Sequence, residues 1–190
     1  SSTLDIKAGD YVSIVNDLTT NATSTLNVEH EGSLVMVDDS GVVTNNGTTN
    51  IYKATSSMEE FDYLYWSSPV DYGNVTPFPT PIAFVLTDFN PSRIYEFNTA
   101  NFDDIDDDYF DDNGNDWIYY DSDMKKGIGY AAMTSASGVR NAIFSGKVNN
   151  GVITVNVGLS NDANGDIDGD EDDWNLIGNP YPSAISADDF

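Results

Sequence analysis

Two acidic stretches contain the residues best suited to bind a ligand or to take part in a reaction. Ten of the 32 acidic residues lie between Asp103 and Asp123, and seven lie between Asp162 and Asp173. Acidic residues that served only solubility would be spread along the chain, whereas clusters this dense repel themselves unless cations neutralise them. The clustering therefore favours bound cations, with two solvated loops that hold no ion as the alternative.

The second stretch has the ligand spacing of a calcium loop. It contains Asn-x-Asp-x-Asp-Gly-Asp starting at Asn164, in which alternate side chains present oxygen ligands to one point and glycine permits a sharp turn. Position 12 is Asn175 rather than the bidentate Glu of an EF-hand, and no flanking helices are expected. We therefore expect a looser calcium loop, with Asn164, Asp166, Asp168, Asp170, Asp172 and Asp173 as the candidate ligands.

The first stretch follows the same logic. Its candidate ligands are Asp104, Asp106, Asp108 and Asp112. Both stretches end in Asp-Trp, at Asp116-Trp117 and Asp173-Trp174, before an apolar segment. Hard oxygen ligands without Cys or clustered His indicate Ca²⁺ rather than zinc or copper. The predicted cofactor is therefore structural Ca²⁺.

Composition excludes several classes of function. The formal net charge is −25, and only seven Lys and Arg are present among 190 residues, so nucleic acids and anionic membrane surfaces are not expected partners. The sequence contains no run of about 18 apolar residues, so membrane insertion is not expected. With no Cys and a single histidine, His30, a thiolate zinc site is impossible, and no motif supports a Ser-His-Asp triad. We therefore expect no enzymatic activity.

The segments that carry these loops are predicted to be strands throughout. In residues 1–53, Leu4 and Ile6 recur as Leu26 and Val28 at a spacing of 22, and Val12 and Ile14 recur as Val35 and Val37 at 23. Repeats of this length favour short stacked β-solenoid coils over an ordinary β-meander.

Residues 54–190 are predicted to form an antiparallel β-sandwich, jelly-roll-like, with acidic loop insertions at 103–116 and 161–173. Asn149-Asn150-Gly151 predicts a hairpin, because Asn and Gly tolerate positive φ. The expected strands lie within 61–70, 93–97, 116–121, 127–133, 141–148 and 151–159.

The first of these strands alternates strongly in character. Phe61, Tyr63 and Tyr65 fall on one face, and Leu64 and Trp66 fall on the other. Aromatic side chains in such strands are most often core or cross-strand pairs. The other interpretation is a sugar-stacking platform made by Tyr63, Tyr65, Tyr119 and Tyr120.

Four segments resemble a β-rich module of large secreted proteins that the type IX secretion system exports and displays on the cell surface. They are YLYWSSPV (63–70), KKGIGYAAM (125–133), FSGKVNNGVITVNV (144–157) and WNLIGNPYPSAIS (174–186), of which the Ser-Ser-Pro and Gly-Asn-Pro-Tyr-Pro-Ser corners are the most specific. The resemblance implies an extracellular or cell-surface location and a sorting domain beyond the present chain. It carries no catalytic residues.

These observations predict a non-enzymatic extracellular or cell-surface β-module of a larger secreted protein, such as an adhesin, a filament or a type IX secretion cargo. The expected partners are neighbouring domains of the same protein, with the secretion machinery and surface glycans as further candidates. The alternatives are a carbohydrate-binding module of a secreted polysaccharide-degrading enzyme and a glycosidase or lyase with paired carboxylates. A concave strip of exposed aromatic residues would favour the sugar binder, facing carboxylates in a cleft the enzyme, and neither feature the structural module.

Overall fold

The computed structural model describes residues 1–71, 82–103, 111–160 and 173–186. Its regular structure is almost entirely strand, which confirms the predicted all-β class, with one turn of helix, α1 (Ile82–Val85), and a 3₁₀ turn, η1 (Thr99–Asn101). The strands are β1 (Ser2–Ile6), β2 (Tyr11–Ile14), β3 (Leu18–Thr20), β4 (Ser24–Val28), β5 (Ser33–Met36), β6 (Val43–Asn45), β7 (Thr48–Met58), β8 (Tyr63–Trp66), β9 (Val70–Asp71), β10 (Phe89–Phe97), β11 (Trp117–Tyr119), β12 (Tyr130–Thr134), β13 (Gly138–Ser145) and β14 (Lys147–Val148).

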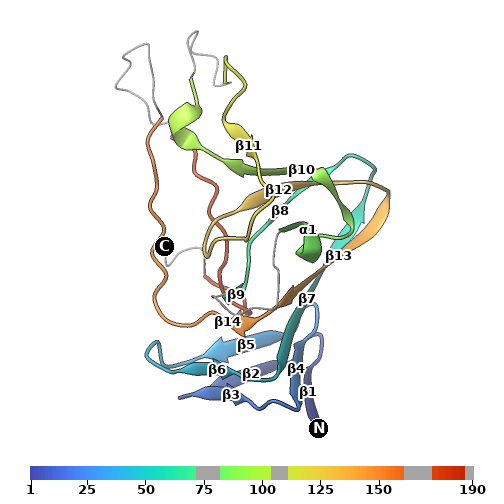
Figure 1. Ribbon diagram of the computed structural model, residues 1–190, viewed down its shortest axis with the longest axis vertical. Coiled ribbons are helices and arrows are strands. Elements are labelled where there is room, and N and C mark those ends of the chain that lie inside the picture. Colours follow the sequence, from blue (N-terminus) through green and yellow to red (C-terminus); the bar gives the residue numbers. More distant parts are fainter. Residues whose placement is uncertain (72–81, 104–110, 161–172, 187–190) are drawn as a thin grey trace.

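Parallel pairs build the N-terminal part of the fold. Strands β1, β2 and β3 pair in parallel with β4, β5 and β6 in turn, and β4 pairs in parallel with β7 (Figure 1). Leu4 lies opposite Leu26 and Ile6 opposite Val28, as the repeat predicted. A ladder of polar side chains crosses the same sheet, since Asn27 Nδ2 donates to Asp5 Oδ1 at 2.8 Å and Asn50 Nδ2 donates to Asn27 Oδ1 at 3.0 Å.

The register of the second parallel pair differs from the prediction by one residue. Val12 lies opposite Leu34 and Ile14 opposite Met36, rather than opposite Val35 and Val37. A slip of one residue moves every side chain of a strand to the other face. The observed register buries Leu34, which is 1% exposed, and leaves Val37 57% exposed. Burial of leucine therefore sets the register, and the similarity of the valines did not reveal it.

Strand β7 joins the N-terminal strands β1 to β6, whose parallel pairs we call the stacked turns, to the rest of the fold. It pairs in parallel with β4 on one side and antiparallel with β13 on the other, so the sheet order is β1-β4-β7-β13. The boundary predicted between residues 53 and 54 falls inside this strand. One buried apolar cluster extends from Ile6 in the stacked turns to Tyr130 in the antiparallel part.

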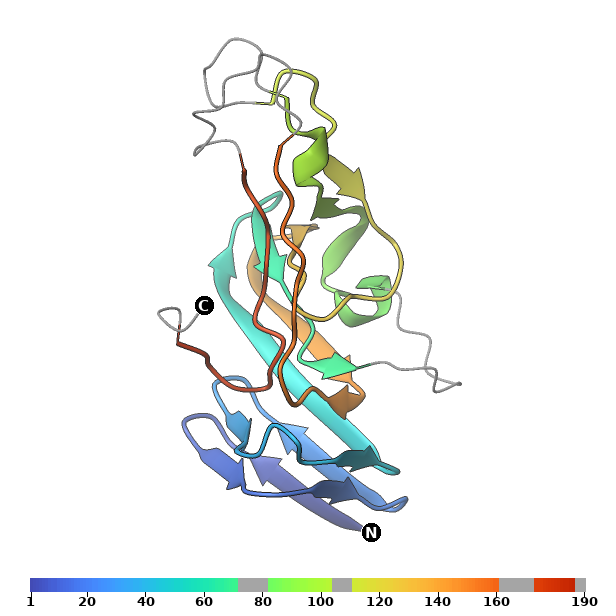
Figure 2. The same ribbon diagram turned by 90° about the vertical axis from the view of Figure 1, so that its left-hand side faces the viewer.

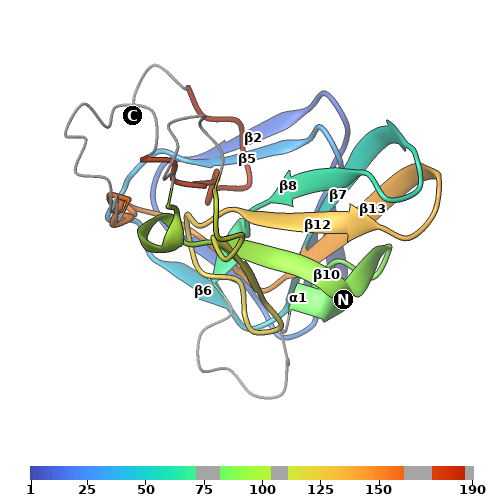
Figure 3. The same cartoon turned by 90° about the horizontal axis from the view of Figure 1, so that it is seen from above.

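A second four-stranded sheet, antiparallel throughout, has the order β11-β10-β12-β8. Figure 3 shows β8, β12 and β10 side by side, with β7 and β13 in the neighbouring layer. The two layers share a core, because the Trp66 ring contacts Phe144 of β13 at a centroid distance of 6.2 Å and meets Phe89 edge-on at 5.6 Å. The inner face of this sheet is therefore buried, which leaves its outer face for other uses.

The predicted strand at 151–159 is not part of a sheet. Residues 152–160 are extended and run beside residues 173–178 (Figure 2). The side chain of Asn175 bridges the two segments, because its Oδ1 accepts from Gly158 N–H and its Nδ2 donates to the Gly158 carbonyl, both at 2.9 Å. The predicted hairpin is therefore wrong in its second arm, although Gly151 has the positive φ of +77° that its turn requires.

Asn149 explains why the chain leaves the sheet at this point. Its side chain is buried, and its Nδ2 donates to the carbonyls of Ser68 at 3.2 Å and Pro180 at 2.8 Å. These carbonyls lie in the two Pro-containing corners, Ser-Ser-Pro and Gly-Asn-Pro-Tyr-Pro-Ser, so one amide ties both corners together. The Asn149 side chain thus links two distant segments by hydrogen bonds, and the chain beyond it does not pair with β14.

Candidate binding face

Alternation along β8 determines which aromatic side chains reach the outer face of the antiparallel sheet. Tyr63 and Tyr65 are 48% and 61% exposed, whereas Trp66 is 8% exposed and packs in the core. The exposed residues are those that the alternating pattern placed together. The faces predicted for Tyr63, Tyr65 and Trp66 are confirmed, whereas Phe61 lies in the turn before β8, with a positive φ of +75°.

Cross-strand register extends the exposed row over the whole sheet. Tyr65 lies opposite Ala131, Ala131 lies opposite Tyr95, and Tyr95 lies opposite Tyr119, so these four side chains share one face. We call the set of aromatic residues on this side the aromatic face; it consists of Tyr63, Tyr65, Tyr95, Phe97, Trp117 and Tyr119.

The rings of the aromatic face contact one another. The Tyr65 and Trp117 rings are parallel, with centroids 6.3 Å apart, and Phe97 meets Trp117 at 5.0 Å and 66°. Tyr63 and Tyr95 form a tilted pair at 6.4 Å. Offset and tilted arrangements of this kind are favourable for aromatic quadrupoles. The face is therefore an ordered array of rings.

Polar groups lie at the edges of the array. The Tyr95 hydroxyl accepts a hydrogen bond from Arg93 Nη1 at 3.1 Å, and the Tyr119 hydroxyl donates to the Pro91 carbonyl at 3.2 Å. Partial burial, followed by the neighbouring Tyr95, raises the pKa of Tyr63, so its hydroxyl keeps its proton over the physiological range. A ligand on this face would meet ring surfaces in the middle and hydrogen-bonding groups at the margin.

Sequence reasoning identified only part of this face. Tyr120, the fourth residue of the predicted platform, lies on the other side of the sheet, where its ring packs at 4.7 Å against the fully buried Tyr130. The prediction omitted Tyr95, Phe97 and Trp117. Tyr95 and Phe97 alternate with Ile94 and Glu96 along β10, and that period of two could have revealed them.

Most of the predicted calcium ligands lie outside the described residues. These are Asp104, Asp106, Asp108, Asn164, Asp166, Asp168, Asp170 and Asp172. Of the two described ones, Asp112 donates its backbone N–H to the Asp103 carbonyl at 2.8 Å, and Asp173 Oδ1 accepts from Ser160 N–H at 2.6 Å. In the described part of the chain, no three His, Asp or Glu side chains form a group that could hold a metal ion. Calcium stays a prediction from spacing.

Two further carboxylates, Asp111 and Asp116, accept backbone hydrogen bonds next to the start of β11. Asp111 accepts backbone N–H groups from Asp103 and Asn115, each at 3.0 Å, and Asp116 Oδ1 accepts from Trp117 N–H at 2.7 Å. Burial, with a smaller contribution from Asp111, raises the pKa of Asp116. Two of these contacts are local to residues 111–117, and the third ties Asp111 back to Asp103, so this carboxylate pair holds the segment that presents Trp117.

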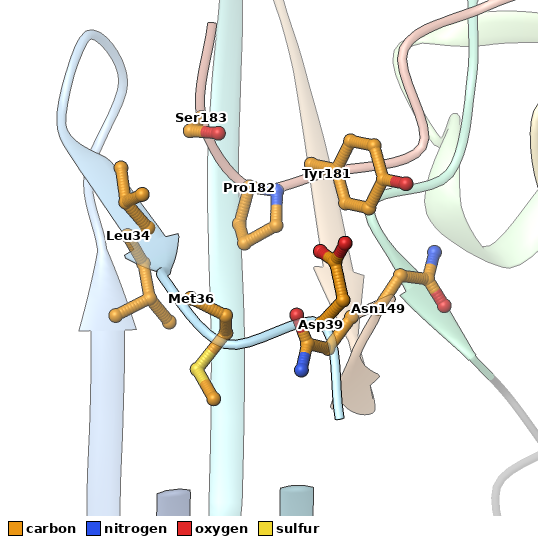
Figure 4. Close-up of a pocket in the computed structure, with 9 residues that line it drawn as sticks. Leu34, Met36, Asp39, Asn149, Tyr181, Pro182 and Ser183 are labelled. Atoms are coloured by element: carbon orange, nitrogen blue, oxygen red, sulfur yellow. The ribbon is translucent and has the colours of Figure 1, made fainter. Parts of the chain in front are cut away.

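A pocket of about 230 Å³ lies where the C-terminal corner meets the stacked turns (Figure 4). Leu34 and Met36 line one side, and Tyr181 and Pro182 line the other. The Pro182 carbonyl accepts from Leu34 N–H at 3.0 Å, and the Tyr181 hydroxyl donates to the Gly151 carbonyl at 2.6 Å. The backbone hydrogen bond holds this corner onto β5, and the side-chain hydrogen bond ties it to Gly151.

The fold and this face define an all-β module that presents an ordered aromatic surface on one sheet. The chain belongs to the family described as Domain of unknown function (DUF8693), whose model matches residues 1–190. Comparison with curated proteins and with solved structures finds no match. No helix in the described ranges has the length and apolar character needed to span a membrane.

Proposed function

We propose that this chain is a non-catalytic carbohydrate-binding module of a larger extracellular protein, and that the aromatic face is its binding surface. The observation that carries the proposal is the row of partly exposed rings from three strands of one sheet, β8, β10 and β11, centred on the parallel pair Tyr65 and Trp117. The expected mark of a sugar binder is a concave strip of exposed aromatic residues, and this face supplies exposed rings.

The chemistry of the face suits sugars. Pyranose rings have C–H-rich faces that pack against flat aromatic surfaces, and hydroxyl groups around their edges that need hydrogen-bond partners. The array supplies both, with Tyr65 and Trp117 in the middle and the Arg93 guanidinium and tyrosine hydroxyls at the margin. The central strand contributes Ala131 and Met133 to this side.

An extracellular location and calcium-stabilised acidic loops remain part of the proposal. The location is supported by the resemblance of the Pro-containing corners to surface-displayed β-modules. Calcium is supported by ligand spacing in 161–173. The non-catalytic role is supported by the composition, and by the engagement of Asp111 and Asp116 with the backbone of a turn.

The proposal is tested by binding of the purified chain to a panel of insoluble and soluble polysaccharides. Depletion from the supernatant, or retardation in a gel that contains the polysaccharide, is expected for at least one member of the panel. Absence of binding across neutral and acidic members, in buffer with calcium, would contradict the proposal.

A further inference from the structure

A second pocket, of about 400 Å³, adjoins the aromatic face at the β8 edge of the antiparallel sheet. It lies between β7, β8 and residues 177–181, and Tyr65 belongs to both the pocket and the aromatic face. Phe144 and Leu64 supply apolar surface, and Tyr181 supplies a second aromatic wall. A chain of sugar units on the face could therefore place one unit in this pocket.

The charge of the pocket differs from that of the protein as a whole. The sequence has 32 acidic residues and a net charge of −25, yet no Asp or Glu is among the described residues that line the pocket. The one charged side chain among them is Lys53. A local positive charge on so acidic a protein indicates that this pocket prefers a negatively charged ligand group.

Lys53 occupies a core-facing position in β7. It lies opposite Ala142, which is 1% exposed, and two residues from Ile51, which is fully buried. Lys53 forms no ion pair within the described part of the chain. Burial lowers the pKa of its ammonium group. An unpaired, partly buried cation is costly in the absence of a counter-charge. A bound anion would supply that counter-charge.

Two further polar groups on the pocket wall lack partners. Trp66 Nε1 and Ser67 Oγ are buried and form no hydrogen bond with any of the described residues. The indole N–H can only donate, and the lysine ammonium can only donate. Both Trp66 Nε1 and Ser67 Oγ have less than 1 Å² of accessible surface, so a bound ligand does not reach them, and Lys53 is the group that selects the charge of the ligand. The charge of Lys53 thus favours a carboxylate over a hydroxyl or an amine.

We propose that this pocket binds a carboxylate-bearing sugar unit, with Lys53 as its counter-charge, so that the ligand of the module is a glycan that contains uronate. This inference rests on the proposed carbohydrate binding and specifies its ligand class. Repulsion from the acidic surface is screened beyond about 8 Å at physiological salt, so the local charge of the pocket decides the contact. A glycan in which uronate units alternate with neutral units suits an acidic protein better than a continuous polyanion.

The test compares one oligosaccharide in two forms, the uronate form and its carboxyl-reduced neutral form, by titration calorimetry at physiological salt. Lys53→Met removes the pocket charge, Lys53→Arg retains it, and Lys147→Met removes an equivalent charge from an exposed lysine of β14. The wild type, Lys53→Arg and Lys147→Met should prefer the uronate form about tenfold, which is about 1.4 kcal/mol. Lys53→Met should bind the two forms equally.

The outcomes separate this inference from the proposed function. Binding of both forms without preference, or an unchanged preference in Lys53→Met, overturns the uronate inference and leaves carbohydrate binding intact. Binding of neither form to any variant overturns both. Competition with acetate distinguishes a simple carboxylate site from a sugar site: acetate should weaken binding of the uronate form only, and complete displacement of both forms by acetate would also overturn the inference.

Discussion

The rings of Tyr65 and Trp117 lie parallel, with centroids 6.3 Å apart, although β8 and β11 are the two opposite edges of their sheet. Neighbouring strands are spaced about 4.8 Å, so three spacings separate the two backbones by about 14 Å. Both side chains must therefore lean inward over β12 and β10. Ala131, a small residue that is 4% exposed, lies between Tyr65 and Tyr95 in the row beneath them and leaves space for this arrangement.

The contact between these rings should be measurable as coupling. A double-mutant cycle of Tyr65→Ala and Trp117→Ala should give an interaction of about 0.5–1.5 kcal/mol in the free energy of unfolding, the range for aromatic pairs. Tyr65→Ala with Tyr11→Ala, a tyrosine of β2 that is 74% exposed, provides the control and should be additive. Additive losses in both cycles would show that the two rings do not interact in solution.

The parallel register of the stacked turns predicts unequal effects for two equivalent leucines. Leu26 is 3% exposed and its strand neighbour Leu4 is 53% exposed. Leu26→Ala should therefore lower the free energy of unfolding by about 2–5 kcal/mol, and Leu4→Ala by less than about 0.5 kcal/mol, as judged by urea denaturation. Similar losses at the two positions would be incompatible with β1 at the exposed edge of the sheet.

The raised pKa of Asp116 predicts a stability that depends on pH. Because the folded state disfavours the ionised carboxyl, Asp116 lowers the stability of the protein at pH values above its folded pKa. This cost disappears as the pH falls toward 3.8, the ordinary pKa of an aspartate. Asp116→Asn removes the charge and keeps an oxygen for Trp117 N–H. The variant should be more stable than the wild type at pH 7, and the difference in urea midpoint should shrink as the pH is lowered. A less stable variant at pH 7 would contradict the assignment.

Calcium should raise the melting temperature if the acidic loops bind it. Binding to the native state alone adds about 2.7 kcal/mol at a ligand concentration 100 times the dissociation constant. Asp166→Asn with Asp168→Asn should abolish the effect, whereas Mg²⁺ should substitute poorly because it requires a tighter octahedral shell. Coincident melting curves in millimolar calcium and in chelator would favour two solvated loops.

Periodicity predicted most of what local pattern controls. The alternation of β8 and the 22-residue repeat placed Tyr63, Tyr65, Leu4 and Leu26 correctly. The position of each residue depends only on the side-chain period of a single strand or on one repeated spacing. The register of β2 against β5 was wrong because burial of Leu34, rather than similarity between valines, determines it.

Long-range contacts account for what the sequence could not reveal. The apolar alternation of residues 151–159 is typical of a strand, but the side chains of Asn149 and Asn175 bind backbone groups that a strand partner would otherwise use. Trp117 joins the aromatic face only because the sheet order places β11 beside β10. The sequence carries no signal for Lys53, since nothing in it shows that this side of β7 faces the core.

The most direct test of carbohydrate binding compares two tryptophan variants on whichever polysaccharide retains the wild-type chain. Trp117→Ala removes the centre of the aromatic face, and Trp174→Ala removes a tryptophan that is 63% exposed and takes no part in the ring contacts of that face. Truncation of a central aromatic anchor costs about 2 kcal/mol or more, so Trp117→Ala should weaken binding about thirtyfold while Trp174→Ala binds as the wild type does. Equal affinities for the wild type and Trp117→Ala, with both chains folded, would contradict a carbohydrate site on the aromatic face.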